Sequence, residues 1–397
     1  MEVERPTWNL ALSSATMNAM VVPSYPVELE QWWLDQARNL TGIREMAPCL
    51  ASLEKDAERL SDLFTLERAP RFGEYARDGR MLFAYGLFFF PQTFVRVQLV
   101  LDELAARCPP SLPPRRILDL GCGSGAASFA ALTHFREAPV EVLGIDASGA
   151  FLDIMKRVFE GGRALWPDAT LRTQESDILS FKGDGPWDLV LVSFALNEAM
   201  ESRPDDEARA WLRRWLDRLS DGGRLVILEP VSRTTSERLE RLRDWVAEEK
   251  LARIVGPCLH HAPCPLLGKA DVWCHEVRRW RIPETLAILN RRLHRSIEDL
   301  KFSYIALERS DAPAPDAAGP ELFRMIAPMR KLKGKLVTAG CAADGGARTY
   351  EMLSRGLNRE EEDALTALER GTVLRAADLK PLADGRTMRV GGMERVK

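Results

Sequence analysis

The sequence of 397 residues has no apolar run long enough to cross a membrane. A transmembrane helix needs roughly 20 apolar residues, and the closest stretch, Leu82–Phe90, is followed at once by Pro91. The N-terminus carries Glu2 and Glu4 and shows neither a charged-then-apolar leader nor an arginine-rich transit pattern. These absences predict a protein without a membrane segment, located in the cytoplasm.

The sequence also lacks a strong overall charge. Its formal net charge is -3, so the whole molecule is not a polycation. Segment 278–335 is an exception, because it holds 13 Lys or Arg against 7 Asp or Glu, most densely at Arg330, Lys331, Lys333 and Lys335. Such a run indicates either a solvated basic face or a surface that contacts phosphate groups.

Cysteine is scarce, with seven residues in the chain. A reducing compartment argues against a disulfide framework. Four of the cysteines lie in the second half of the sequence, three of them within 17 residues and one at a distance: Cys258, Cys264, Cys274 and Cys341.

The spacing of apolar residues divides the chain into regions. Residues 28 to about 108 repeat apolar positions every three or four residues, which predicts helices. From Arg115 onward, short apolar strands alternate with amphipathic helices, and this alternation predicts a doubly wound parallel sheet covered on both faces. The predicted strands are 117–120, 140–145, 170–174, 189–194, 224–228, 302–307 and 335–339, the last two completing the same sheet.

A glycine-rich loop follows the first predicted strand and opens a helix. It reads Asp-Leu-Gly-Cys-Gly-Ser-Gly over residues 119–125. Glycines allow a tight turn there and let a ligand approach the backbone. The second strand ends in Asp146, and an acid roughly 20 residues or a little more beyond such a loop accepts hydrogen bonds from ribose hydroxyls. The pattern favours a nucleotide cofactor over a purely structural turn.

Two cofactor classes fit this loop. A dinucleotide fingerprint has its third glycine where Ala126 stands, a replacement that the fingerprint tolerates. Asp119, however, lies two residues before the first glycine, where an acid reaches the cationic end of a ligand. This arrangement resembles the loop of class I methyltransferases, which bind S-adenosylmethionine. The resemblance implies cofactor binding at Asp119, Gly121, Cys122, Gly123, Gly125, Asp146, Asp177 and Ile178, with Asp177 placed like the residue that contacts the adenine.

The sequence nominates no catalytic residue. The end of the fourth strand, 193–198, lacks the Asn/Asp-Pro-Pro-aromatic pattern of base amino-group methylation and the Pro-Cys pair of attack on a pyrimidine ring. Asn197 and Glu198 are polar residues in the right place, but capping of a helix explains them equally well. Whether the protein transfers methyl groups is therefore left open.

The cysteine segment reads Pro-Cys-Leu-His-His-Ala-Pro-Cys-Pro and, further on, Trp-Cys-His. Closely spaced thiolates repel one another unless a cation offsets their charge, so the segment indicates a metal site rather than buried unpaired cysteines. Zinc would take three cysteines and one of His260, His261 or His275. An iron–sulfur cluster would take Cys341 as its fourth ligand. The spacings of five and nine intervening residues do not fit the usual zinc pairs.

Several of these motifs together resemble one family. Five segments are similar to the ribosomal small-subunit methyltransferase-like family: the cysteine segment, Lys-Phe-Ser-Tyr at 301–304, Gly-Cys-Ala-Ala-Asp-Gly at 340–345, Tyr85 with Phe-Pro-Gln-Thr at 90–93, and Leu-Asn-Glu-Ala at 196–199. Its eukaryotic members are mitochondrial factors that assemble the small ribosomal subunit. Leu259 and Glu276 depart from the pattern, where relatives have a proline and an aromatic residue, but neither change removes a ligand.

The resemblance implies an S-adenosylmethionine site, contact with the small ribosomal subunit and its rRNA, and a 4Fe-4S cluster held by Cys258, Cys264, Cys274 and Cys341. The expected fold is a class I methyltransferase (Rossmann-like) α/β sheet with an N-terminal helical domain and a cysteine-bearing metal insertion. The expected units are a helical domain at 1–110, the cofactor-binding core at 111–232, the insertion at 233–300, the last core strands with the fourth cysteine at 301–350, and an extension at 351–397.

Three functions fit these features. The first is a small-subunit assembly factor that binds rRNA, has a possible rRNA methylation activity and carries the cluster as a structural element. The second is a methyltransferase of a small molecule or another RNA, with a structural zinc. The third is a non-enzymatic RNA-binding module that has lost the cofactor. The sequence does not indicate an oligomeric state.

Overall fold

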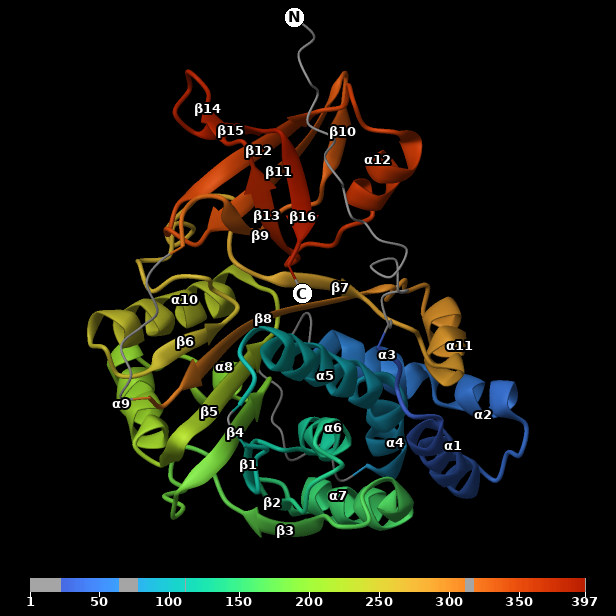
Figure 1. Cartoon of the computed structure of the whole chain (residues 1–397). Coiled ribbons are helices and arrows are strands. Elements are labelled where there is room, and N and C mark those ends of the chain that lie inside the picture. The colour runs from blue at the N-terminus through green and yellow to red at the C-terminus, as the bar shows by residue number, and fades with distance from the viewer. Residues whose placement is uncertain (1–22, 64–77, 111, 311–317, 397) are drawn as a thin grey trace, which may run out of the picture.

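The computed structural model describes residues 23–63, 78–110, 112–310 and 318–396. These residues form two sheets of eight strands each, and most of the helices surround the first sheet (Figure 1). The second sheet lies at the other end of the molecule, beyond the long strand β8 (Asp299–Glu308). Among the described residues, no helix combines the length and apolarity needed to cross a bilayer.

Helices form the N-terminal part of the described chain, as predicted. They are α1 (Val27–Thr41), α2 (Met46–Ser52), α3 (Glu54–Asp62), α4 (Gly79–Phe88) and α5 (Phe90–Arg107). In α1 the buried residues Leu29, Trp33 and Ala37 repeat every four positions, which places them on one face of the helix. These helices share their hydrophobic core with strands of the first sheet. They therefore cover that sheet directly and have no separate core.

The first sheet confirms the predicted strand–helix alternation. Its strands are β1 (Arg116–Leu120), β2 (Glu141–Asp146), β3 (Thr170–Glu175), β4 (Trp187–Ser193), β5 (Leu219–Glu229), β6 (Arg253–Gly256), β7 (Glu276–Arg279) and β8. The helices along this part of the chain are α6 (Ala126–His134), α7 (Gly149–Gly161), α8 (Leu196–Ala199), α9 (Asp205–Leu216), α10 (Arg233–Glu248) and α11 (Glu284–Arg292), with a short 3-10 turn at Arg163–Leu165.

Alternating side chains in the central strands bind the two layers of helices. In β4, Leu189 and Leu191 enter the core shared with α4–α7, whereas Val190 and Val192 enter the core shared with α9 and α10. The strand order is β3-β2-β1-β4-β5-β8-β6. β1 to β5 run parallel, and β8 is antiparallel to both β5 and β6. The sheet is thus doubly wound, with one reversed strand near its edge.

The second sheet corrects one prediction. Only the stretch at 302–307 joins the first sheet, as part of β8, whereas the stretch at 335–339 belongs to β11 in the second. The elements there are β9 (Leu322–Met325), β10 (Arg330–Leu332), β11 (Lys335–Ala342), β12 (Ala347–Leu353), α12 (Arg359–Thr366), β13 (Val373–Ala377), β14 (Lys380–Pro381), β15 (Thr387–Val390) and β16 (Gly392–Arg395).

A separate core explains why β11 is not in the first sheet. The rings of Phe323 and Tyr350 stack with centroids 3.6 Å apart, and Leu336 and Leu374 pack in the same cluster. Alternation of apolar residues predicts that a segment is a strand, but it does not specify the partner strand. A capping box formed by Asn358 and Glu361 opens α12.

Buried charges join the two sheets. Arg324 of β9 lies between Glu276 of β7 and Glu103 of α5, with N–O distances of 2.7 Å to Glu276 and 2.5 Å to Glu103. The side chains of Arg324 and Glu276 are only 4% and 3% exposed. Burial opposes ionisation of Glu103, but Arg324 holds the pKa of this carboxyl well below its ordinary range. The junction is therefore ionic, and it is out of water.

Candidate cofactor cavity and cysteine site

The glycine loop between β1 and α6 has a backbone that side chains do not readily adopt. Gly121, Gly123 and Gly125 have φ values of 75°, 51° and 92°. A Cβ on Gly121 would collide with the Cβ of Ala195, and one on Gly125 would lie 2.6 Å from the ring of Phe129. The loop thus passes close to the turn after β4 and opens α6 as predicted.

Asp119 lies at the end of β1 and is fully buried. Its Oδ2 accepts hydrogen bonds from the backbone N–H and the hydroxyl of Ser128, at 3.1 and 2.6 Å. Its Oδ1 has no hydrogen-bond partner among the described residues. Burial raises the pKa of Asp119 to about 7. A buried carboxylate oxygen without a partner fits a cationic ligand group such as the ammonium of S-adenosylmethionine.

Asp146 ties the glycine loop to the end of β2. Its Oδ2 accepts the N–H of Gly123 at 2.8 Å, and its Oδ1 accepts the N–H of Ser148 at 2.9 Å. Burial raises the pKa of Asp146 above its ordinary value. The structure thus places Asp146 against the glycine loop, and binding of ribose by Asp146 stays a prediction.

The remaining predicted cofactor residues lie on the same edge but differ in exposure. Asp177 follows β3, is exposed and accepts the N–H of Leu179 at 2.6 Å. The side chain of Ile178 is buried in the core, and its carbonyl accepts the indole N–H of Trp211 at 3.0 Å. Cys122 is buried against Gly144, where an added Cβ would lie 2.9 Å from its Sγ. No contact with an adenine follows from these positions alone.

Tyr85 of α4 lies beside the glycine loop, although the sequence placed it only in a family motif and not among the cofactor residues. Its hydroxyl lies 3.9 Å from where a Cβ on Gly123 would stand, and its ring packs edge-on against Phe151 at 5.3 Å. Burial, followed by the charges of Glu198 and Asp146, raises the pKa of Tyr85. A tyrosine inside an apolar run was the available signal, but no linear spacing links that run to the loop.

Glu229 at the end of β5 organises the turn after β4. It is 2% exposed, and its Oε1 accepts the N–H of Asn197 at 3.1 Å. With the amide of Asn197 turned so that its nitrogen faces Glu229, Nδ2 donates to Oε2 at 2.7 Å and to the carbonyl of Phe194 at 3.1 Å. Burial raises the pKa of Glu229 to about 8. Asn197 is thus used to hold the turn, and the geometry assigns no catalytic residue.

The four predicted metal ligands come from two parts of the fold. Cys258, Cys264 and Cys274 lie between β6 and β7, and they line one cavity together with Glu240 and Arg243 of α10. Cys341 lies on β11 of the second sheet. Burial, then the nearness of Cys258 and Cys264, raises the pKa of both Cys274 and Cys341. The four thiols therefore share one region, and none forms a disulfide.

Helix α10 holds the backbone of the cysteine segment. Both carboxylate oxygens of Asp244 accept the N–H of Cys264, at 2.9 and 3.0 Å, and Glu240 accepts the N–H of Cys274 at 2.7 Å. Arg243 is 1% exposed and donates to the carbonyl of His260 at 2.5 Å. Residues 240, 243 and 244 lie on one face of a helix, so a single surface orders the whole segment.

The side chains of this region are not gathered tightly around a single point. Within the described residues, no group of three or more His, Cys, Asp or Glu side chains is arranged to hold a metal ion. Cys341 itself contacts the cysteine segment through its Sγ, which lies 3.4 Å from His260 Nε2. The predicted metal insertion therefore stays a prediction.

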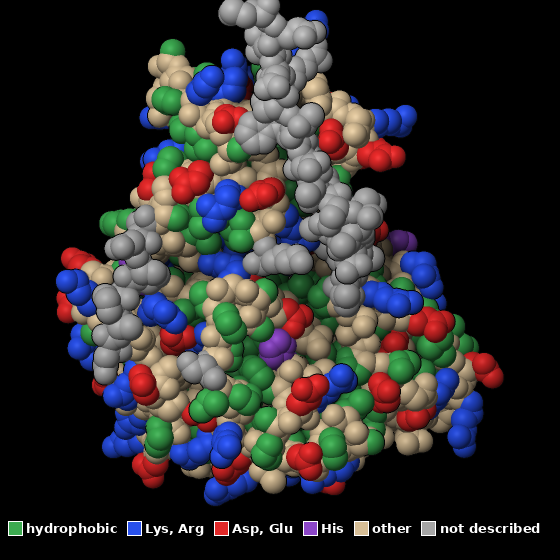
Figure 2. Space-filling view, in the orientation of Figure 1, with side chains coloured by type: hydrophobic (Ala, Val, Ile, Leu, Met, Phe, Trp, Pro, Cys, Tyr) green, Lys and Arg blue, Asp and Glu red, His purple; other side chains and the backbone are tan. Residues whose placement is uncertain are grey.

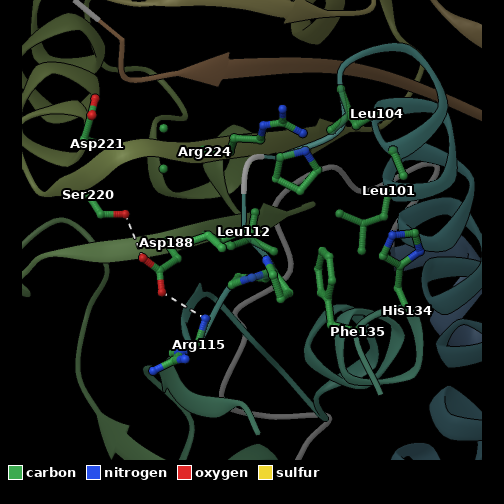
Figure 3. Close-up of a pocket in the computed structure, with 17 residues that line it drawn as sticks. Leu101, Leu104, Leu112, Arg115, His134, Phe135, Asp188, Ser220, Asp221 and Arg224 are labelled. Atoms are coloured by element: carbon green, nitrogen blue, oxygen red, sulfur yellow. Dashed lines mark hydrogen bonds between the residues drawn. The ribbon is translucent and has the colours of Figure 1, made fainter. Parts of the chain in front are cut away.

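A cavity of about 280 Å³ lies at the end of the first sheet where β1 and β4 begin (Figure 3). Leu101, Leu104 and Phe135 form its apolar wall, and Asp188 near the start of β4 is a polar residue on the opposite side. Asp188 is already used, because it accepts the N–H of Arg115 at 2.9 Å and the hydroxyl of Ser220 at 2.7 Å. This cavity is separate from the glycine loop, which lies at the carboxyl ends of the strands.

The fold and the loop together define the class of the protein. Five parallel strands, a reversed strand between the fifth and the edge strand, and a glycine loop after the first strand make up the class I methyltransferase fold. The family model described as "Mitochondrial small ribosomal subunit Rsm22" matches residues 80–357, more than two thirds of the chain. The chain belongs to the Rsm22 family, and the resemblance found in its motifs is confirmed.

One curated relative is the human "Ribosome assembly protein METTL17, mitochondrial". It is 25% identical over 182 residues, which cover 44% of this chain and 39% of the human protein. The predicted cytoplasmic location is contradicted, because both the family and this relative are described as mitochondrial. The prediction of location used only the pattern of the N-terminal residues. The family match instead covers residues 80–357.

Two solved structures are similar in outline. A class I S-adenosylmethionine-dependent methyltransferase from Listeria monocytogenes is 15% identical, with a TM-score of 0.39 over 73% of this chain and 90% of that one. Magnesium protoporphyrin IX methyltransferase from Synechocystis PCC 6803 is 14% identical, with a TM-score of 0.34 over 55% of this chain and 84% of that one. Likeness at this level says nothing about the substrate.

Proposed function

We propose that this protein binds S-adenosylmethionine at its glycine loop and acts in assembly of the small ribosomal subunit, with a 4Fe-4S cluster as a structural element. The observation that carries the cofactor proposal is the buried Oδ1 of Asp119, which has no partner among the described residues and stands at the head of the loop. Membership of the Rsm22 family carries the ribosomal part.

Charge favours S-adenosylmethionine over a nicotinamide dinucleotide. Asp119 and Asp146 at the loop are joined by Glu198 and Glu229, whose pKa values are raised by burial and, for Glu198, by neighbouring carboxylates. A cationic sulfonium and ammonium lower the cost of ionising such groups. A pyrophosphate would add negative charge to the same place, which the acidic surroundings oppose.

Three features support the cluster. The thiols of Cys258, Cys264 and Cys274 border one cavity, Cys341 approaches from the second sheet, and α10 orders the backbone between them. A cube of four irons binds each thiolate at a different corner, so it needs thiols that are spread apart, whereas a single zinc ion needs them close together. The cluster would contribute a covalent tie between the two sheets.

The basic excess of segment 278–335 is weaker support for an RNA-binding surface than the sequence indicated, because ion pairs use part of it. Six of the 13 basic residues in segment 278–335 form ion pairs with acids: Arg278, Arg292, Arg295, Arg324, Lys331 and Lys335. Figure 2 shows acidic and basic side chains interspersed over one face of the molecule, without a single basic patch. Contact of this face with rRNA would therefore be made at separate points.

The first experiment measures iron and acid-labile sulfide on protein purified without oxygen. About four of each per chain and a broad visible absorbance are expected. Cys264→Ser should lose the absorbance and part of the stability, whereas Cys108→Ser, outside the site, should keep both. One zinc with no sulfide would overturn the cluster and favour a structural zinc.

A second experiment tests the functional part separately. Calorimetric titration with S-adenosylmethionine is expected to show one site per chain, and sedimentation with purified small subunits is expected to show salt-dependent association. Absence of cofactor binding would leave a non-enzymatic binding module. Cofactor binding without subunit association, together with methylation of an unrelated small acceptor, would overturn the ribosomal role.

A further inference from the structure

Helix α5 brings a cation close to the turn that follows β4, next to the glycine loop. The guanidinium carbon of Arg96 lies 5.3 Å from the ring centre of Phe194, the residue that follows β4. Phe194 has a φ of 60°, a left-handed backbone that a large residue adopts only under constraint. The next residue, Ala195, is the one that a Cβ on Gly121 would strike. Arg96 therefore sits one side-chain layer from the glycine loop.

A second set of contacts leads to the same place from the other side. The hydroxyl of Tyr85 stands over Gly123, and the ring of Tyr85 packs 5.7 Å from that of Phe89. Positions 89, 92 and 96 are three and four residues apart where α5 begins, so they lie on one face. The glycine loop, α4, α5 and the turn after β4 therefore lie around one place.

Arg96 has no acidic partner in the part of the chain that the structure describes. Its Nη2 donates to Gln92 Oε1 at 3.3 Å, and its Nε is out of water without any partner. Burial lowers the pKa of Arg96 to about 10, with no carboxylate to offset it. Arg107, on the same helix, instead pairs with Glu103 at 2.8 Å. A guanidinium partly removed from water is costly without an anion, so its position calls for one.

S-adenosylmethionine has one anionic group, the carboxylate on the carbon that also bears the ammonium. We propose that Arg96 binds this methionyl carboxylate, while Asp119 takes the ammonium. The inference rests on the proposed cofactor. Guanidinium groups bind carboxylates through two parallel hydrogen bonds, which gives such a contact both strength and orientation. Gln92 holds the guanidinium in place through Nη2, and its own amide is fixed by donating to the carbonyl of Phe88 at 2.6 Å.

The test compares two ligands on two proteins. Decarboxylated S-adenosylmethionine keeps the sulfonium, the ammonium and the nucleoside but lacks the carboxylate. For the unaltered chain, S-adenosylmethionine should bind about 10- to 100-fold more tightly than the decarboxylated ligand. Arg96→Met should remove that difference by weakening only the first ligand. Arg96→Lys, which keeps the charge but not the paired geometry, should give an intermediate loss.

Thermal unfolding of the ligand-free variants shows whether the fold is kept. Equal weakening of both ligands by Arg96→Met would mean a structural role and overturn the proposal, and so would unchanged affinity for both. Loss of binding to an rRNA fragment with full cofactor affinity would assign Arg96 to a phosphate instead. If the unaltered chain binds neither ligand, the cofactor proposal itself fails, and that result differs from all the others.

Discussion

The cofactor cavity and the cysteine site are built in opposite ways. The cavity's central residues, 119–125 and Asp146, come from two adjacent strands and one loop, and their main contacts are local. The cysteine site joins a loop between β6 and β7 to a strand of a different sheet. The first site forms wherever the sheet forms. The second requires that both sheets fold and dock.

The two sites also balance charge differently. The cavity concentrates carboxylates whose pKa values are raised by burial, as at Asp119 and Glu229. The junction beside the cysteines pairs its buried acids with arginines, as at Arg324. Unbalanced buried charge is typical of a place that receives a charged ligand, whereas balanced charge holds a structure together. Changes at one site are therefore expected to leave the other largely intact.

The largest effect is expected for Cys341→Ser. This change removes the only proposed ligand contributed by the second sheet, so iron should be lost and the free energy of unfolding should fall by several kcal/mol. Affinity for S-adenosylmethionine should change less than twofold, because the cavity has no residue from β11. Iron content, limited proteolysis and calorimetry measure the three quantities. Full iron in the variant would contradict the assignment.

The next largest effect is expected at the ionic junction. Arg324→Met removes one of the two arginines that pair with both Glu103 and Glu276, the other being Arg278, and should cost roughly 3 kcal/mol of stability. Arg359→Met is the matched control, because Arg359 is 93% exposed and pairs with Asp363 at 3.8 Å; it should cost less than about 1 kcal/mol. Urea unfolding of both variants measures the difference. Equal stability would show that the junction is not needed for docking.

A smaller, more local effect is expected for Asp119→Asn. Loss of the charge that faces the ammonium should weaken S-adenosylmethionine binding about 100-fold, or roughly 2.7 kcal/mol. Iron content should not change. The ligand-free variant should be at least as stable at pH 8, because the ionised carboxyl is disfavoured by burial. Asp177→Asn, at an exposed residue, should have a smaller effect on affinity. Titration calorimetry of both variants tests this order.

The smallest effect is a pH dependence. Because the folded-state pKa of Asp119 is raised to about 7, the folded protein takes up a proton before the unfolded chain does. The contribution of Asp119 to the free energy of unfolding of the ligand-free protein therefore increases as pH falls from about 7 to about 4. Cofactor affinity should move the other way and fall about fivefold between pH 7 and pH 6, because the ionised fraction of Asp119 falls by that factor. In Asp119→Asn this dependence of affinity should disappear.

Much of the first sheet and of the cofactor loop could be predicted from the sequence. Periodicity marked β1 to β5 and the helices between them, because each element buries a face that the sequence spells out residue by residue. The glycines at 121, 123 and 125 specified their own turn, because an L side chain would be strained at those φ values. These features are set by residues that are close together in the chain, so the sequence alone is enough to predict them.

Only the tertiary structure decided the rest. Tyr85, Arg96 and Glu229 reach the glycine loop or the turn after β4 from segments that no spacing connects to the loop. β11 joins the second sheet because its apolar side chains pack with Phe323 and Tyr350 in a separate core. A linear sequence states which residues are apolar or charged, but which distant surfaces meet is set by packing of whole elements, and that energy belongs to no single segment.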